Sequence, residues 1–246
     1  KNNLTNMYVK QIIDSLNIDI IGLQEIESLS YFNNLLDSLG QQWTGFRSGG
    51  INSEYGELSY IINTSNIEIS RNPYTILNND SYYFAFREPY VLEISYNNEN
   101  LVLINIHYKC CGDGDLDKED ITDEENRRLQ ASLILHEYIN SNYNNSKVIV
   151  LGDFNDDLTE DDNNIFVPFL SDMNNFSFTD FGIAESSNEF WSFPSWPSHL
   201  DHILITNELF NYVVDTQTVL VGWSLIGGLS AYDIYVSDHR PVIIKI

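Results

Sequence analysis

Five short groups of polar residues in this sequence stand where apolar runs begin or end, as at the ends of buried strands. A carboxylate at the edge of an apolar strand is costly unless it is paired or bound to a cation. One such group means little, but five predict that the strand ends converge on one site. Carboxylates, imidazoles and amides together can bind a hard divalent cation and transfer protons. The groups are Gln24-Glu25, His107, Asp153-Phe154-Asn155, Asp201 and Ser237-Asp238-His239.

The elements that must position these groups follow from apolar spacing. Helix-like spacing predicts helices over 4–16, 29–39 and 123–140, and short apolar runs predict strands over 18–23, 58–62, 67–69, 90–95, 101–107, 147–151, 202–205, 212–219 and 241–246. The first strand is expected to be buried. The third helix is expected to turn Leu129, Leu133, Ile134 and Ile139 inward. Strands that pair both as hairpins and through helical crossovers predict a mixed α/β fold of two packed sheets with helices outside.

Composition limits the class of protein. The 246 residues carry 36 Asp and Glu against 12 Lys and Arg, a formal charge of −24. Apolar residues make up 43% of the chain, with 15 Tyr and 13 Phe, which excludes a disordered acidic chain. No run approaches the ~18 apolar residues of a membrane span. No linker or repeat divides the sequence, so we expect one domain over 1–246.

The negative charge also limits the partners. It argues against nucleic acid or an anionic lipid bound through a basic face. A site for a phosphate group would therefore need a local positive charge, and a carboxylate-bound metal ion is the obvious source.

The polar groups, taken together and in order, resemble the endonuclease/exonuclease/phosphatase superfamily. The resemblance spans 23 to 241, and Gly-Asp-Phe-Asn followed by Ser-Asp-His-x-Pro is its most specific part. It implies a deoxyribonuclease I-like α/β fold, a four-layer α-β-β-α sandwich of two mixed sheets with the site at one end of both. The matching pieces are Leu23-Gln24-Glu25, Asn105-Ile106-His107, Gly152-Asp153-Phe154-Asn155, Leu200-Asp201-His202-Ile203 and Ser237-Asp238-His239-Arg240-Pro241.

The resemblance also implies a metal site. Glu25 would be the principal ligand of a catalytic Mg²⁺ or Mn²⁺, and Asp238 would assist in the same pocket. Asp153, beside that metal, would orient or deprotonate the attacking water. Asn155 would hold a phosphate oxygen.

The resemblance also implies roles for two histidines. His239 would donate to the scissile phosphate, with Asp201 on its other ring nitrogen, and His107 would be a second acid or phosphate donor. A carboxylate beside a histidine fixes its tautomer and favours its protonated form. The alternatives are a satisfied histidine at a strand start and a turn aspartate.

Two further pieces resemble the deoxyribonuclease I branch. Tyr55-Gly56-Glu57 matches its Tyr-x-Glu, which implies that Glu57 orients His107 and places Tyr55 at the substrate. Arg87-Glu88-Pro89 matches its Arg-Glu-Pro, which implies that Arg87 contacts a phosphate. The alternative for Arg87–Glu88 is a surface ion pair of little energetic value.

The start of the sequence departs from the family pattern. The family usually begins with a strand ending in an Asn near the metal, whereas this sequence begins with the predicted helix over 4–16. The domain is therefore expected to lack its first strand, either because the chain is trimmed or because the strand is missing.

The segment after His107 is rich in acidic residues. Lys109 is a candidate local cation for substrate binding, and the adjacent Cys110 and Cys111 are expected to be free thiols, with a strained vicinal bridge as the alternative. Acidic spacing in this segment partly matches a calcium loop, so a structural Ca²⁺ is the alternative to a solvated surface loop. The acidic residues concerned are Asp113, Asp115, Asp117 and Glu124. The stretch 156–162 is likewise expected to be a surface loop.

An aromatic segment precedes Asp201. It could stack on bases or enter lipid, but we expect its rings to pack onto the edge of the domain. The residues are Trp191, Phe193, Pro194, Trp196 and Pro197.

The sequence as a whole predicts metal-dependent hydrolysis of phosphodiesters, by a secreted or cell-surface endonuclease acting on DNA. The alternatives are a phosphatase or phosphodiesterase for a small or lipid-linked phosphate, and a catalytically idle binding domain. We expect a monomer without a protein partner that contacts nucleic acid as a transient substrate. The charge of −24 predicts that this contact is weak and metal-dependent.

Overall fold

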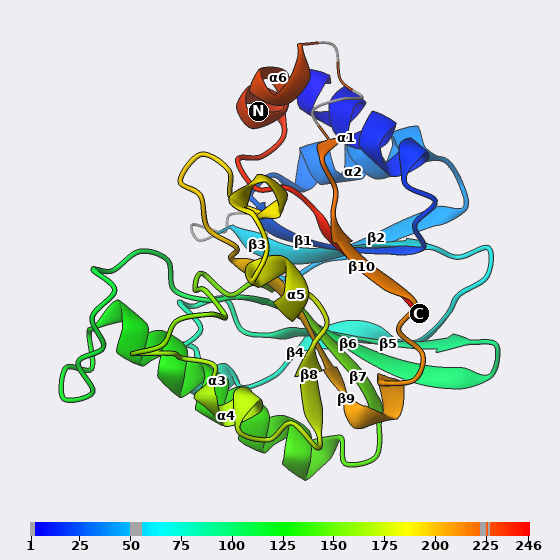
Figure 1. The fold of residues 1–246 in the computed structure, drawn as a ribbon. Coiled ribbons are helices and arrows are strands. Elements are labelled where there is room, and N and C mark those ends of the chain that lie inside the picture. The colour runs from blue at the N-terminus through cyan, green and yellow to red at the C-terminus, as the bar shows by residue number, and fades with distance from the viewer. Residues whose placement is uncertain (1–2, 50–55, 222–224, 226) are drawn as a thin grey trace.

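The computed structural model describes residues 3–49, 56–221, 225 and 227–246. Two β-sheets pack face to face and helices cover the outer side of each, so the predicted four-layer sandwich is confirmed (Figure 1). The first helical layer is α1 (Asn3–Ser15), α2 (Leu29–Leu39) and α6 (Gly228–Tyr235), above β1 (Ile20–Ile26), β2 (Trp43–Arg47), β3 (Glu57–Asn63), β10 (Asp215–Thr218) and β11 (Val242–Lys245). The second sheet and its helices are β4 (Glu68–Thr75), β5 (Tyr90–Tyr96), β6 (Glu99–His107), β7 (Lys147–Asp153), β8 (Phe176–Phe178), β9 (Asp201–Thr206), α3 (Glu124–Asn142) and α4 (Val167–Leu170).

The six-stranded sheet sets the register of the site. Its order is β4-β5-β6-β7-β9-β8, antiparallel except for β6 and β7, which α3 connects as a parallel crossover. In this register His107 on β6 lies opposite Asp153 on β7, and Asp153 lies opposite Asp201 on β9. Three of the polar residues singled out in the sequence therefore occupy neighbouring strand ends.

Strand alternation divides the core into two parts. On β6, Ile104 and Ile106 face the helices α3 and α4, whereas Leu101 and Leu103 face the smaller sheet. All four side chains are buried. The strand is thus covered on both faces, which explains its nearly continuous apolar run.

Asn105 lies among these apolar residues and joins the two sheets. Its Nδ2 donates to the carbonyl oxygens of Leu23 (3.1 Å) and Ser59 (3.0 Å), and its Oδ1 accepts from Gln24 Nε2 (2.7 Å). A fully buried amide costs free energy unless its hydrogen bonds are made, and here they are made across the sheet interface. Asn105 therefore holds the end of β1 against β6, next to Glu25.

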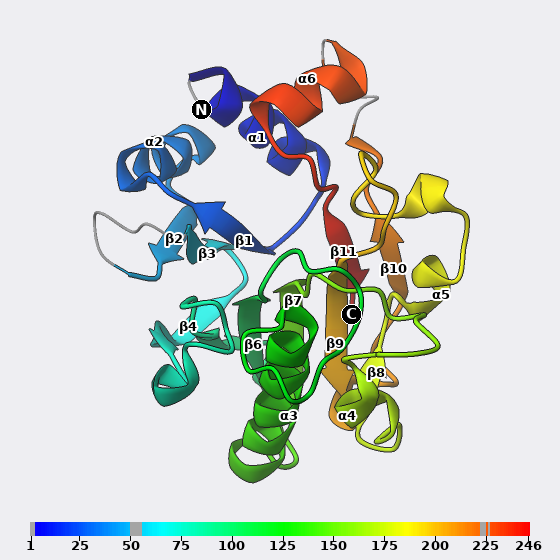
Figure 2. The ribbon, with the colours of Figure 1, turned by 90° about the vertical axis from the view of Figure 1, so that its left-hand side faces the viewer.

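The smaller sheet is divided into β1-β3-β2 and β10-β11. β1 contacts β7 and β11 contacts β9, so both lie on the six-stranded sheet below α1 (Figure 2). Within the part of the chain that the structure describes, β1 pairs only with β3 and β11 pairs only with β10. The expectation that 18–23 forms a buried strand was wrong in this respect, because β1 with one paired edge is half-buried.

The remaining differences concern local pattern. β2, β8, α4, α6 and the short helix α5 (Phe181–Ala184) were not predicted, and three 3₁₀ turns (Asn78–Asp80, Asn188–Phe190, Asn207–Leu209) complete the described elements. In α3, Leu133 is exposed and Leu135 is buried in its place. The stretch 156–162 is not wholly a surface loop, since Asp156 and Leu158 are buried. No helix among the described residues has the length and apolarity to cross a membrane.

Candidate active site

Four of the predicted residues meet where β6, β7 and β9 end. His107, Asp153 and Asp201 are adjacent by strand register, and His239 joins them from the segment between α6 and β11. Oxygen and nitrogen atoms of Asp153, Asp201 and His239 lie within 4.8 Å of one another. The convergence of strand ends on one site, inferred from the sequence, therefore holds for these four.

Hydrogen bonds and one aromatic contact fix the position of His239. Its Nδ1 lies 2.7 Å from Asp201 Oδ2, its backbone N–H donates to Ser237 Oγ, and the Tyr232 hydroxyl donates to its carbonyl. Phe193 packs on the ring with centroids 4.8 Å apart. Burial disfavours the charged ring, but the Asp201 hydrogen bond and the surrounding carboxylates outweigh it and raise the His239 pKa to about 9. The ring is therefore a cation at neutral pH.

Asp153 is the most buried carboxylate of this group. Its Oδ1 accepts from the backbone N–H of Asn155 at 2.9 Å. Burial and the nearby charge of Asp201 raise the pKa of Asp153 to about 7. A carboxyl group with this pKa can hold or release a proton near neutrality.

His107 is buried beside Asp153, with its Nε2 3.4 Å from Asp153 Oδ2. Burial and the positive charges of Arg87 and His239 lower the His107 pKa to about 3, so the ring is neutral. Its Nδ1 has no hydrogen-bond partner within residues 3–49, 56–221, 225 and 227–246. The pairing implied for Glu57 is not formed: Glu57 Oε2 accepts from Ser48 Oγ instead.

Arg87 and Lys109, predicted to bind the substrate, form hydrogen bonds within the protein instead. Arg87 donates to the carbonyl oxygens of His107 and Tyr108, which fixes the end of β6. Lys109 Nζ donates to the Cys110 carbonyl and lies 3.6 Å from Glu124. Tyr55, predicted to contact substrate, lies outside the described residues.

Glu25 and Asn155 share an unusual backbone conformation. Their φ angles are +58° and +56°, in the left-handed region that few residues other than glycine adopt. Glu25 sits where the pairing of β1 with β3 shifts register, and Gly56 packs so closely that an added Cβ would lie 2.9 Å from the Glu25 Cα. Asn155 Nδ2 donates to the Tyr108 carbonyl. Such strained positions concentrate at functional sites.

Glu25 and Asp238 are the metal ligands that the family resemblance implies, although neither belongs to a group of three potential metal ligands among the described residues. Both carboxylates are exposed, and among the described residues no hydrogen bond or ion pair engages either one. Oxygen donors of this kind suit Mg²⁺ or Mn²⁺. The group Asp153–Asp201–His239 fits a metal less well, because His239 Nδ1 donates to Asp201 and the ring is cationic.

The calcium-binding set that was the alternative to a solvated acidic loop is not assembled. Asp113 comes within 4.8 Å of Asp123 and Glu125, whereas Asp115, Asp117 and Glu124 join no such group among the described residues. Cys110 and Cys111 are free thiols.

A second histidine cluster was missed by sequence reasoning. Asp180 Oδ2 lies 3.0 Å from His199 Nε2 and 2.6 Å from His202 Nδ1, and all three side chains are buried. His199 Nδ1 accepts from the Ser192 N–H, so its Nε2 carries the proton and cannot bind a metal. His202 Nε2 donates to the Asp156 carbonyl, which makes His202 a donor at both nitrogens and hence a cation.

Ser192 links this buried cluster to the site. Its Oγ accepts from the backbone N–H groups of Leu200 and Asp201, and its carbonyl accepts from the N–H of Arg240. Ser192 therefore connects Asp201, which orients His239, to Arg240, which follows His239 in the chain.

The aromatic segment divides between core and solvent. Trp191 is half-buried and donates from its Nε1 to the Ile183 carbonyl, and Phe193 packs on His239. Trp196 is 78% exposed, so the expectation that it packs onto the domain was wrong. Beside His239, Pro194, Ser195, Tyr232 and Asp238 line a cavity of about 340 Å³.

Comparisons with solved structures show the same fold. D. rerio TDP2 complexed with single strand DNA product is 12% identical, with 98% of this chain and 90% of that chain covered and a TM-score of 0.70. The 3′ phosphatase NExo from Neisseria, bound to product DNA hairpin, is 16% identical over 99% and 95% of the two chains, with a TM-score of 0.68. The mannosyl-6-phosphatase of Bacteroides thetaiotaomicron is 15% identical over 98% and 90%, with a TM-score of 0.63.

At these identities the likeness shows the fold alone. No curated protein sequence matches the chain. The model of the endonuclease/exonuclease/phosphatase family, however, matches residues 3–239, nearly the whole chain. The strand-end carboxylates and histidines described above lie within that match, and the chain belongs to the endonuclease/exonuclease/phosphatase family.

Proposed function

We propose that this protein is a divalent-metal-dependent phosphodiesterase that cleaves DNA. Membership in the family supports hydrolysis of phosphate esters. The observation that carries the proposal is the state of His239: Asp201 occupies its Nδ1, and its Nε2 has no partner among the described residues. A cationic donor with one committed and one available nitrogen suits an anionic substrate.

His239 would donate from Nε2 to a phosphoryl oxygen as negative charge develops there. Asp201 keeps the ring oriented and cationic, because its carboxylate holds the Nδ1 proton. The stacked Phe193 ring and the Tyr232 hydrogen bond limit movement of the imidazole. The donor is thus pre-organised, which avoids the cost of reorientation during the reaction.

Asp153 would accept the proton of the attacking water. Its pKa of about 7 makes it a usable base near neutrality, and the Asn155 N–H fixes one of its oxygens. Asn155 would keep a second amide proton for a phosphate oxygen, since among the described residues its Nδ2 donates only to the Tyr108 carbonyl. Glu25 and Asp238 would hold the divalent cation, which when bound neutralises charge on the phosphoryl group.

The choice of DNA rests on the comparisons and on the open surface. Two of the similar structures are complexes with DNA products. Trp196, exposed three residues after the Phe193 that packs on His239, offers a ring on which a base can stack. With Arg87 and Lys109 bound internally, attraction of the substrate would depend on the metal and on His239, so binding should be weak when the metal is removed.

One observation favours a second candidate substrate. The cavity of about 340 Å³ beside His239 has the size of a small-molecule site. A small phosphate ester, rather than a polymer, would fit it, and one of the similar structures is a mannosyl-6-phosphatase.

Supercoiled plasmid nicking decides between these possibilities. We expect nicking with Mg²⁺, none with chelator, and a loss in His239→Ala of about 10³- to 10⁴-fold. His136→Gln is the matched control, because His136 lies on the outer helix α3 and pairs with Asp172. If no nucleic acid is cleaved but a sugar phosphate or a phosphorylated head group is hydrolysed, the second candidate is correct. If nothing is hydrolysed, the domain is a binding module.

A further inference from the structure

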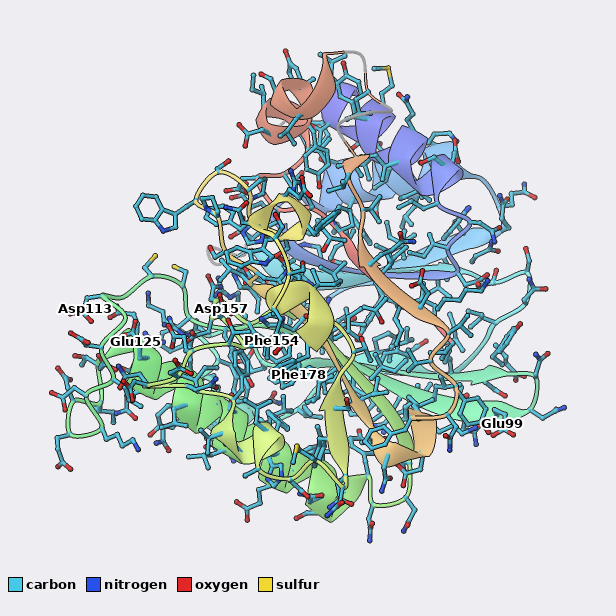
Figure 3. The ribbon with its side chains drawn as sticks, viewed as in Figure 1. Glu99, Asp113, Glu125, Phe154, Asp157 and Phe178 are labelled. Atoms are coloured by element: carbon cyan, nitrogen blue, oxygen red, sulfur yellow. The ribbon has the colours of Figure 1, made fainter. Side chains whose placement is uncertain are left out.

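We propose that Asp113, Asp123 and Glu125 form a second divalent-cation site, suited to Ca²⁺, that fastens the loop 108–123 to the start of α3. One carboxylate oxygen from each residue lies within 4.8 Å of the other two. Figure 3 shows Asp113 and Glu125 close together at the end of α3 nearest the loop. No residue of this cluster belongs to the active site described above.

Glu125 provides the second observation, beyond the gathering of acidic residues. Its side chain is 5% exposed, and its Oε1 accepts from the Gly114 N–H and from Arg128 Nη2. Its Oε2 is shielded from solvent and has no hydrogen-bond partner in the part of the chain that the structure describes. A buried carboxylate oxygen without a partner costs free energy, and a cation between the three carboxylates would supply the missing partner.

The positive charge nearby is already shared. The guanidinium of Arg128 bonds both Glu125 and the buried Asp156, and its Nη1 donates to the carbonyls of Lys109 and Cys111. No Lys, Arg or His in the described part of the chain forms an ion pair with Asp113 or with Asp123. The three carboxylates therefore lie close together with one counter-ion, Arg128, which also neutralises Asp156. A divalent ion would balance the remaining negative charge.

The donor set favours Ca²⁺ over softer ions. All three ligands are carboxylates, with no thiol or imidazole in the group, and the site lies on a long irregular loop. Ca²⁺ accepts six to eight oxygens in flexible geometry, whereas Mg²⁺ demands an octahedron and Zn²⁺ prefers nitrogen or sulfur. A loop without helix or strand over 108–123 is long for a compact domain, and an ion joining Asp113 to the helix start would hold it.

The test is thermal unfolding of the full chain with CaCl₂ or with chelator, in a Glu25→Gln background that weakens the active-site cation. We expect Ca²⁺ to raise the melting temperature by about 5 °C at saturating concentration. Asp113→Asn should abolish the shift. Asp115→Asn is the matched control, because it removes the same charge from a neighbouring exposed residue outside the cluster, and it should retain the shift.

Three results would overturn the proposal. One is an equal melting temperature with Ca²⁺ and chelator, and another is an equal shift in Asp113→Asn and Asp115→Asn. The third is loss of the shift in both variants, which would show diffuse screening of the acidic loop rather than a site. A Ca²⁺ titration should also show one bound ion lost in Asp113→Asn, and Asp123→Asn repeats the test at the helix start. None of these measurements depends on hydrolysis.

Discussion

Two carboxylate–histidine clusters in this protein use the same residue types and differ in what they leave available. Asp201 lies 2.7 Å from the Nδ1 of His239, and Asp180 lies 2.6 Å from the Nδ1 of His202. The His202 Nε2, however, is committed to the Asp156 carbonyl, and the whole cluster is sealed in the core. The His239 Nε2 is uncommitted among the described residues, and its side chain is 23% exposed.

The difference shows that pairing of Asp with His does not by itself indicate a catalytic site. Phe154 and Phe178, labelled in Figure 3, pack against the His202 ring at 5.5 and 5.9 Å between centroids, so no substrate reaches it. The buried cluster acts as an ion pair that joins chain segments, whereas the half-buried Asp201–His239 pair leaves one ring nitrogen uncommitted among the described residues. Four experiments can break or sharpen this comparison.

The largest effect on the free energy of unfolding is expected from Asp180→Asn. Removing the charge leaves a buried histidine cation without its counter-ion, which costs about 3–5 kcal/mol of unfolding free energy. Urea denaturation measures this loss, and the protein that remains folded should keep most of its hydrolytic rate. A variant as stable as the parent would show that the buried cluster is not an ion pair.

The same substitution at the other cluster, Asp201→Asn, should have the opposite profile. Hydrolysis is expected to fall by about 10²- to 10³-fold, because His239 loses its orientation and its charge, while the free energy of unfolding should fall by less than in Asp180→Asn, because the His239 side chain is 23% exposed and stays partly hydrated. Steady-state rates and urea denaturation of the same preparation measure both. Equal effects on stability in the two variants would remove the distinction between the clusters.

The pH dependence of stability separates the clusters further. Burial works against charge on His202, but Asp180 outweighs it and raises the His202 pKa; burial would raise the Asp180 pKa, but the two histidines lower it. The raised His202 pKa contributes stability that is complete below about pH 6.5 and is lost as pH rises through the folded value. The lowered Asp180 pKa contributes stability that is complete above about pH 3.9 and is lost as pH falls through the folded value.

The stability difference between the parent and Asp180→Asn should therefore be largest between about pH 4 and 6.5 and smaller at pH 9. Urea denaturation of both proteins across this range measures it. A difference that grows towards pH 9 would contradict the protonation state assigned to His202.

A smaller effect on hydrolysis is expected at Ser192, the residue that joins the two clusters. Ser192→Ala leaves the N–H groups of Leu200 and Asp201 without their acceptor, at a cost of about 1–3 kcal/mol. A shift of Asp201 should also lower hydrolysis by about 10-fold. Ser192→Thr keeps the hydroxyl and should restore the rate, and a Thr variant as slow as Ala would assign the effect to packing alone.

The sequence predicted the positions of candidate site residues at strand ends better than it predicted the side-chain pairings that depend on tertiary contacts. His107, Asp153 and Asp201 were recognisable because each ends or begins an apolar run, and strand register then brings them together. The orientation of a side chain is not encoded in such runs. Glu57 therefore matched a motif and yet bonds to Ser48.

The fold shows the same limit. Apolar spacing predicted the three longest helices and most strands, but α3 also buries the charged residues Glu125 and Arg128 in its first turns, where they pair with each other and Arg128 also pairs with Asp156. A pattern that counts only apolar residues cannot find such a face. Asp180 was missed for a related reason, since its partners His199 and His202 lie about twenty residues away and become neighbours only when β8 pairs with β9.

The left-handed backbone at Glu25 and Asn155 has a consequence for any effort to engineer this protein. A glycine at either position would relieve strain on the order of 1 kcal/mol or more, so selection for heat resistance alone would favour it. The same change would delete the carboxylate proposed to bind the metal ion or the amide proposed to bind a phosphate oxygen. Libraries screened for thermostability should thus accumulate inactive clones at these two codons, and a screen that preserves function has to monitor turnover from the first round.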